Sequence, residues 1–154
     1  MIILGIETSC DETAAAVLRS DPSINSGQVQ ILSNVVASSA LLQAKYGGII
    51  PEQAAREQIK SIIPVIETAI HDSRLTINEL GAIAVTYGPG LIGSLLVGVE
   101  TAKTLAQVWN KPLIPVNHLI GHFYANWIET TSSLRDHEVA KQSQKQIATS
   151  PAAP

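Results

Sequence analysis

The sequence has almost no cysteine. Cys10 is the only one among 154 residues, so an internal disulfide is excluded and a reducing compartment is favoured. Asp11 and Glu12 follow it directly, and their negative charges should disfavour the thiolate that a nucleophilic cysteine needs. We therefore expect Cys10 to be a small packed residue and not a catalytic nucleophile.

Charged residues are also scarce. They make up 15% of the chain, against about 25% in an average soluble domain. The net charge is -3, so the chain has no basic surface of the kind that binds nucleic acid, and any RNA would need phosphate contacts from elsewhere. Because 45% of the residues are hydrophobic, two interpretations stay open. Either another lobe or subunit covers part of the surface, or the sheet is buried on both faces.

We do not expect residues 1–5 to be a signal peptide, since they contain no basic residue and Glu7 interrupts the apolar run. One uncharged run, residues 80–99, has the length of a membrane span. A Gly-Pro-Gly turn at 88–90 interrupts it, and Glu79 and Glu100 flank it where Lys or Arg would be expected. A buried strand, a turn and a buried helix explain this run better, and we predict a cytoplasmic protein with no membrane partner.

The alternation of apolar and polar residues predicts three strands, then helices alternating with two more strands. A helix should begin at Pro51 and be kinked or divided at Pro64, with apolar Ile59, Ile62, Ile63, Ile66 and Ile70 on its packed face. The helix at 94–108 is apolar on most faces, so we expect it to be buried. The predicted strands are residues 2–8, 13–18, 29–37, 82–87 and 113–116, and the other helical segments are 76–79 and 118–127.

This order predicts an α/β fold: a ribonuclease-H-like or actin-like ATPase lobe, with a mixed five-stranded sheet and helices on both faces. A generic doubly wound α/β domain is the alternative. The lobe should span residues 1–127. Residues 128–154 are rich in Ser, Thr, Gln, Lys and Ala, and we expect a disordered polar tail there.

Two of the four histidines, His118 and His122, stand four residues apart in the last predicted helix. That spacing puts both imidazoles on one face, where they can hold one transition-metal ion. Spacing alone also fits two ordinary polar helix residues. A zinc protease of the H-E-x-x-H type needs Glu directly after the first histidine, and this chain has Leu119 there.

The turn after the first strand carries a second candidate site. The hydroxyls of Thr8 and Ser9, with backbone amides, can hold a phosphate or an adenylate, so both residues are candidates for substrate binding. Asp11 and Glu12 are the catalytic candidates, because a carboxylate there can position a metal ion or accept a proton. A plain hairpin turn is the alternative.

The turn at residues 88–94 is the third candidate. Gly88 and Gly90 let the backbone approach a substrate closely, and the helix that follows attracts anions at its N-terminus. The spacing matches neither the P-loop nor the dinucleotide fingerprint, and a tight strand-to-helix turn is the alternative. A ribonuclease would need further carboxylates on the sheet, and none follows the strand at 82–87.

Four motifs, in order and spacing, resemble those of the TsaD family, the tRNA threonylcarbamoyladenosine transferases that were long labelled O-sialoglycoprotein endopeptidases or glycoproteases. The resemblance extends from residue 1 to about residue 127. The motifs are Gly5-Ile6-Glu7-Thr8-Ser9-Cys10-Asp11-Glu12-Thr13, Tyr46-Gly47-Gly48-Ile49-Ile50-Pro51-Glu52, Gly88-Pro89-Gly90-Leu91 and His118-Leu119-Ile120-Gly121-His122.

The resemblance implies two actin-like lobes and an acyltransferase. That enzyme moves threonylcarbamoyl from threonylcarbamoyl-AMP to N6 of the adenosine beside the anticodon, in tRNAs that read codons beginning with A. His118 and His122 match the family's two metal-binding histidines, usually assigned to iron (Fe²⁺), and Asp11 matches an acidic residue of the active site. The implied partners are a TsaB-like paralogue, a TsaE-like ATPase and tRNA.

The chain also departs from the family pattern. No Ser-Gly-Gly-His segment follows the histidine pair, and the second lobe with its aspartate, the expected third metal ligand, is absent from these residues. A truncated transferase, inactive alone, is therefore one expectation. A non-catalytic interaction or dimerisation module of the same pathway is the alternative, and a metallopeptidase is disfavoured by Leu119.

Overall fold

Five strands form one mixed sheet in the computed structural model, which describes residues 1–20, 29–126 and 128. The predicted polar tail lies outside the described residues, apart from Ile128. The strands are β1 (Ile2–Glu7), β2 (Glu12–Ser20), β3 (Val29–Ser38), β4 (Ala82–Gly88) and β5 (Leu113–Asn117). The helices are α1 (Ala40–Ala44), α2 (Pro51–Asp72), the 3₁₀ turn η1 (Ile77–Glu79), α3 (Ile92–Val108) and α4 (His118–Ala125).

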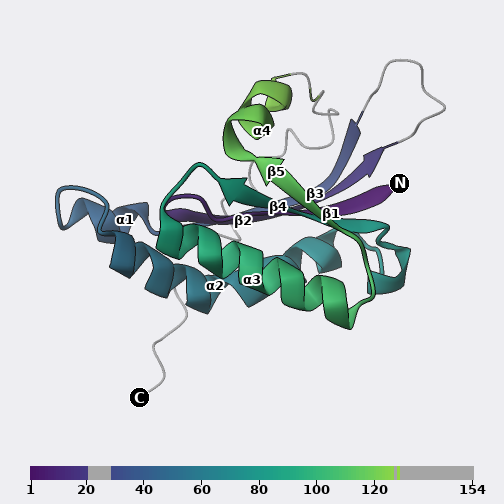
Figure 1. Cartoon of the computed structure of the whole chain (residues 1–154), viewed down its shortest axis with the longest axis horizontal. Coiled ribbons are helices and arrows are strands. Elements are labelled where there is room, and N and C mark those ends of the chain that lie inside the picture. The colour runs from purple at the N-terminus through teal and green to yellow at the C-terminus, as the bar shows by residue number, and fades with distance from the viewer. Residues whose placement is uncertain (21–28, 127, 129–154) are drawn as a thin grey trace.

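The strand order is β3-β2-β1-β4-β5, with β1 at the centre (Figure 1). β1 pairs antiparallel with β2, and β2 pairs antiparallel with β3. On its other edge β1 runs parallel to β4, and β4 runs parallel to β5. This is the predicted antiparallel meander continued into a parallel half. The carboxyl ends of β1, β4 and β5 therefore meet at one edge of the sheet.

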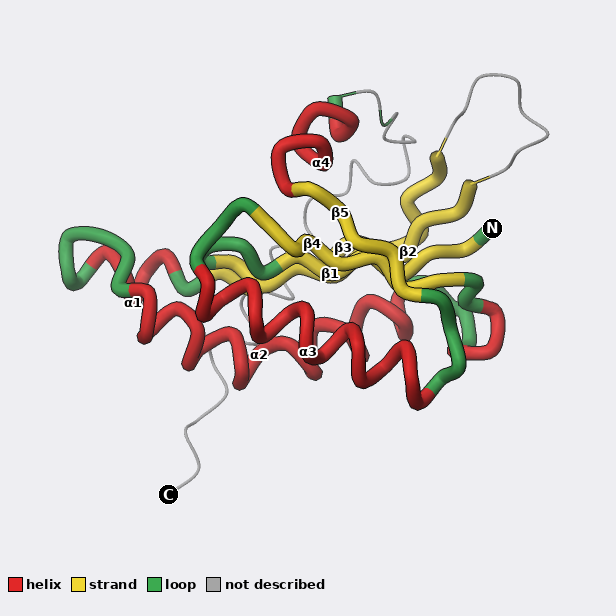
Figure 2. Tube along the Cα trace, viewed as in Figure 1, coloured by secondary structure: helices red, strands yellow, loops and turns green. Residues whose placement is uncertain are grey.

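Alternation along the strands produces one strongly buried face. Leu4 and Ile6 of β1 and Ala15 and Val17 of β2 have almost no exposed surface. α2 packs on β2 and β3, and α3 packs on β4 and β1, so both long helices cover this face (Figure 2). α4 lies on the other side of the sheet, and its main contacts are with β5 and β4. The expected helices on both faces are thus unequal: two long ones on one face and a short one beyond the end of β5.

α2 is one continuous helix, so of the two expectations for Pro64, a kink or a division, the division is wrong. Pro51 occupies the first turn, where its missing N–H leaves no bond unmade. The packed face is also rotated from the one that isoleucine spacing predicted. Gln58 and Ile62 are buried, whereas Ile59 and Ile63 are exposed. The rotation brings Gln58 toward the turn after β1, where it has hydrogen-bond partners.

α3 corrects a second expectation, since it is not buried on most faces. Its buried residues are small and recur every four positions: Ser94, Gly98, Ala102 and Ala106. The larger side chains are less buried: Val97, Val99 and Leu105 pack only partly against the core, and Ile92 is 77% exposed. Small residues let the helix backbone lie close to β1, which explains why the small side chains of α3 are buried and its larger side chains are more exposed. No helix among residues 1–20, 29–126 and 128 has the length and apolar character to cross a membrane.

Candidate functional site

One glutamine side chain holds the turn between β1 and β2 through hydrogen bonds. The side-chain amide of Gln58, itself buried, donates to the carbonyl oxygens of Thr8, Cys10 and Glu12 at 3.3, 3.1 and 3.0 Å. The Ser94 hydroxyl donates a further bond of 2.9 Å to Cys10. Three carbonyls of this turn therefore point into the fold toward α2 and α3.

The remaining carbonyls of the turn are also bonded. The Ser9 carbonyl accepts from the Leu91 amide at 2.8 Å. The Asp11 carbonyl accepts from both the backbone N–H and the hydroxyl of Ser39, at 3.2 and 2.8 Å. Residues 8–12 are thus anchored to α2, to the turn before α3 and to the segment after β3. Asp11 and Glu12, whose carboxylates are the catalytic candidates, are half-buried and exposed respectively.

Thr8 and Ser9, the substrate-binding candidates, lie mostly inside. Thr8 has no exposed surface, and its hydroxyl donates to the Ser94 carbonyl at 2.8 Å. Ser9 is 4% exposed. Gly90 packs directly on Ser9, because a Cβ on Gly90 would lie 2.6 Å from the Ser9 carbonyl oxygen. The structure therefore brings two of the three candidate segments together, the turn after β1 and the turn before α3. Gly88 ends β4 with a φ of +151°, which favours glycine.

The burial of this turn also affects Cys10. Burial raises the pKa of the Cys10 thiol, and the neighbouring carboxylate of Asp11 raises it further. The predicted weakness of the thiolate is confirmed in direction, although burial is the larger cause.

The histidine pair begins α4, directly after β5. The Asn117 side chain caps this helix by accepting from the backbone amides of Leu119 and Ile120, at 3.0 and 3.3 Å. The Nε2 atoms of His118 and His122 lie 3.0 Å apart, with the ring planes at 90°. The two imidazoles therefore share one face of the helix, as their spacing predicted.

This geometry fits one metal ion held by two nitrogens. Two nitrogens at about 2.1 Å from one ion are about 3.0 Å apart when the angle at the ion is roughly 90°. The residues present would supply only part of a coordination sphere. Within the part of the chain that the structure describes, no group of three or more His, Cys, Asp or Glu side chains could hold a metal ion.

Glu7 joins the histidine pair to the turn. This residue ends β1, and its Oε1 accepts from the Ser9 amide at 2.7 Å and lies 3.5 Å from Nδ1 of His118. Sequence patterns did not single out Glu7 or Gln58 as site residues. The available signals were an acid ending an apolar strand and a glutamine one turn before a buried isoleucine.

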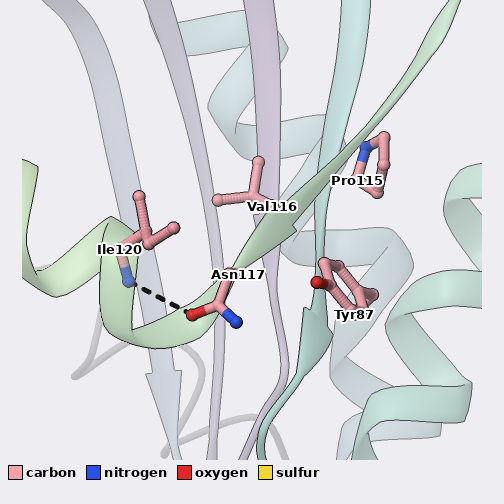
Figure 3. Close-up of a pocket in the computed structure, with 5 residues that line it drawn as sticks. All are labelled: Tyr87, Pro115, Val116, Asn117 and Ile120. Carbon is pink, nitrogen blue, oxygen red and sulfur yellow. Dashed lines mark hydrogen bonds between the residues drawn. The ribbon is translucent and has the colours of Figure 1, made fainter.

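A broad, open, mostly apolar hollow of about 620 Å³ lies at the start of α4, and neither His118 nor His122 is among the residues that line it. Its lining comes from the ends of β4 and β5 and the first turn of α4: Tyr87, Pro115, Val116, Asn117 and Ile120 (Figure 3). Figure 3 also shows the cap bond from the Ile120 amide to Asn117. The hollow is therefore next to the carboxyl ends of the parallel strands, where open α/β sheets bind ligands.

Solved structures of similar shape show the fold. YeaZ from Pseudomonas aeruginosa matches with a TM-score of 0.54 and 15% identity, over 76% of this chain and 45% of that chain. RuvC from Thermus thermophilus matches with a TM-score of 0.51 and 15% identity, over 76% and 64%. The sheet is therefore that of the ribonuclease-H-like and actin-like ATPase fold, as the order of elements predicted.

Sequence relatives are much closer. The tRNA N6-adenosine threonylcarbamoyltransferase of Thermomicrobium roseum is 57% identical over 83% of this chain, and that of Dehalococcoides mccartyi is 50% identical over 83%. The chain spans 33% and 37% of the length of these two relatives. The sequence model of TsaD, tRNA N6-adenosine threonylcarbamoyltransferase, matches residues 30–136. The chain belongs to the TsaD family.

Proposed function

We propose that this chain forms one wall of a site that transfers threonylcarbamoyl from threonylcarbamoyl-AMP to N6 of the adenosine beside the anticodon of tRNA. The observation that supports this most directly is the convergence of three segments at one edge of the sheet. The turn that carries Asp11 and Glu12, the Gly88–Gly90 turn and the histidine pair all lie there. Glu7 contacts Ser9 and His118, and the Ser9 carbonyl accepts from the Leu91 amide. The two relatives that are 57% and 50% identical to this chain are named tRNA N6-adenosine threonylcarbamoyltransferase, which supports this reaction.

In this proposal the carboxylates of the anchored turn handle the proton. The N6 amine of adenosine attacks the carbonyl carbon of the threonylcarbamoyl group, a C–N bond forms, and the C–O bond to AMP breaks. Asp11, with Glu12 beside it, accepts the proton that the amine loses, and AMP leaves with the bonding electrons. Gly88 and Gly90 allow the substrate to approach the backbone closely.

His118 and His122 would hold the metal ion, which we propose to be Fe²⁺. When bound, such an ion withdraws charge from phosphate or carbonyl oxygens of the substrate. The distance of 3.0 Å between the two Nε2 atoms supports this assignment, and at least one further ligand must come from outside the described residues. We also propose that the wall of the site facing this one is formed by residues outside those that the structure describes.

The proposed partners are a TsaB-like paralogue and a TsaE-like ATPase, with tRNA as the substrate of the complete assembly. Exposed apolar side chains on the outer side of the helix layer, at Ile59, Ile63 and Leu96, support a protein partner there. The same side chains favour the second candidate function, a non-catalytic interaction module. A net charge of -3 supports tRNA contacts made mainly by other parts of the assembly. A tRNA substrate and a single cysteine support a cytoplasmic location.

A complementation experiment separates these functions. The chain is expressed in bacteria depleted of their own transferase, alone or with a second polypeptide that supplies the rest of the Thermomicrobium roseum relative, and threonylcarbamoyladenosine in tRNA is measured by mass spectrometry. We expect the modified nucleoside only with both polypeptides. Asp11→Asn should lower its rate of formation by about 10²-fold or more, while Asp72→Asn, at the far end of α2, should not. Full activity of the Asp11→Asn chain would contradict the catalytic role, and binding to a TsaB-like protein without any modification would favour the interaction module.

A further inference from the structure

The two rings of the histidine pair are oriented by more than the helix that carries them. Their Nε2 atoms lie 3.0 Å apart, within hydrogen-bond distance, with the two rings edge to face. The other ring nitrogen of His118, Nδ1, lies 3.5 Å from Oε1 of Glu7. We propose that Glu7 is a positioning residue that holds His118 as the Nδ1–H tautomer, so that the lone pair on Nε2 is directed at a metal ion. This role rests on the proposed metal pair.

The carboxylate is well placed for this role because it is itself fixed. Glu7 ends the central strand β1, and its Oε1 accepts the Ser9 amide at 2.7 Å. The side chains of His118 and Glu7 are 25% and 36% exposed, so water screens their interaction less than that of a surface pair. A carboxylate that accepts from the outer nitrogen of a metal-binding histidine fixes its tautomer and raises its basicity.

The same geometry argues against Glu7 as a direct ligand. An ion shared by both Nε2 atoms would lie beyond the His118 ring as seen from Glu7. Glu7 also fails to complete a group of three potential ligands among the residues that the structure describes. Glu7 also contacts Ser9 in the anchored turn. A shift of this turn would therefore move the Glu7 carboxylate and change the direction of the His118 ring.

The chain contains a matched control. His71 and Asp72, at the end of α2, form a second histidine–carboxylate contact of 3.2 Å between Nδ1 and Oδ1, but the His71 side chain is 88% exposed. Asp72→Asn removes one negative charge beside a histidine, as Glu7→Gln does, far from the pair at α4. An effect of the overall net charge on metal uptake will therefore appear in both variants, whereas an effect of the carboxylate next to His118 will appear only in Glu7→Gln.

The experiment titrates Co²⁺ into the full 154-residue chain and follows the visible absorption of the bound ion. Glu7→Leu should weaken Co²⁺ binding by about 10- to 100-fold, Glu7→Gln by less than about tenfold because its amide oxygen can accept from Nδ1, and Asp72→Asn not at all. Circular dichroism confirms the fold of each variant. Equal losses in Glu7→Gln and Glu7→Leu would overturn the orienting role, since charge alone would then account for the effect.

A second measurement needs no metal. Long-range ¹H–¹⁵N spectra of the imidazole rings, with His118 assigned from a His118→Ala chain, should show the Nδ1–H tautomer in the wild type and the Nε2–H tautomer in Glu7→Leu. The same tautomer in both would overturn the proposal. Absence of Co²⁺ uptake by the wild-type chain would overturn the metal pair itself, whereas unchanged uptake by Glu7→Leu would overturn only the role of Glu7.

Discussion

Gln58 offers the sharpest test of how the site is built, because one buried amide serves three carbonyls 46 to 50 residues away. The substitution Gln58→Leu removes that donor and preserves most of the volume. The Cys10 carbonyl keeps its bond from Ser94, but the carbonyls of Thr8 and Glu12 lose the Gln58 amide. The turn that carries the proposed catalytic carboxylates is therefore loosened on the side facing α2.

The expected change in the free energy of unfolding follows from the hydrogen bonds that are lost and the unpaired buried atom that is removed. Each buried carbonyl left without a partner costs about 1–3 kcal/mol. The bond to Thr8 is the longest of the three, at 3.3 Å, so its loss belongs at the low end. The substitution also removes the Gln58 Oε1, a buried atom that has no partner of its own, which offsets one such term. We expect a net loss of roughly 1–3 kcal/mol in the free energy of unfolding.

Urea denaturation followed by circular dichroism measures this difference directly. Gln58→Glu is the companion variant, since it keeps the shape but turns carboxylate oxygens toward the same carbonyls. Burial raises the pKa of the introduced carboxyl, so its folded-state value exceeds the unfolded one near about 4.3. The loss of stability should then be greatest at pH 7 and shrink as the pH falls toward the unfolded value, where the carboxyl is protonated in both states. A change below about 0.5 kcal/mol for Gln58→Leu, or a pH-independent loss for Gln58→Glu, would refute the role of Gln58 as the clamp of the turn.

Two further predictions concern the same region. Gly98→Ala should destabilise the fold by about 1–2 kcal/mol in a urea titration, because a new Cβ would meet the buried Thr8 side chain and the overpacking outweighs the roughly 1 kcal/mol gain in helix propensity. This loss should largely disappear in a Thr8→Ala background. Additive effects of the two substitutions would contradict the contact. The rate at which Cys10 reacts with iodoacetamide should rise at higher pH than for a free cysteine, because burial and the Asp11 charge both raise the pKa of the thiol. Asp11→Asn should move this pH profile part of the way back. A wild-type profile like that of free cysteine would contradict the prediction.

The sheet could be predicted from the sequence because each strand carries a local pattern. Apolar alternation identified all five strands and their order, with ends displaced by about two residues at most. β2 runs on to Ser20, past its predicted end, because its pairing with β3 continues beyond a bulge after Val17. α1 was missed, since this five-residue helix has no acidic residue in its first turn and no side-chain cap.

What could not be predicted depends on contacts between distant segments. The exposure of α3 follows from how closely Gly98 approaches Thr8, and no count of apolar residues contains that distance. In the sequence Gln58 is an ordinary polar helix residue, because its three carbonyl acceptors come within hydrogen-bond distance only in the folded chain. The histidine pair was found from spacing, but its link to the turn through Glu7 depends on β1 and β5 ending at the same edge.

The five carbonyl anchors of residues 8–12 have a thermodynamic consequence for ligand binding. Ordering the backbone of one residue costs about 1–2 kcal/mol of conformational entropy, or roughly 5–10 kcal/mol for these five. Folding itself covers that cost through bonds to α2, α3 and the segment after β3. A substrate that meets this turn finds it preorganised, so its binding energy is free to favour the transition state over the ground state.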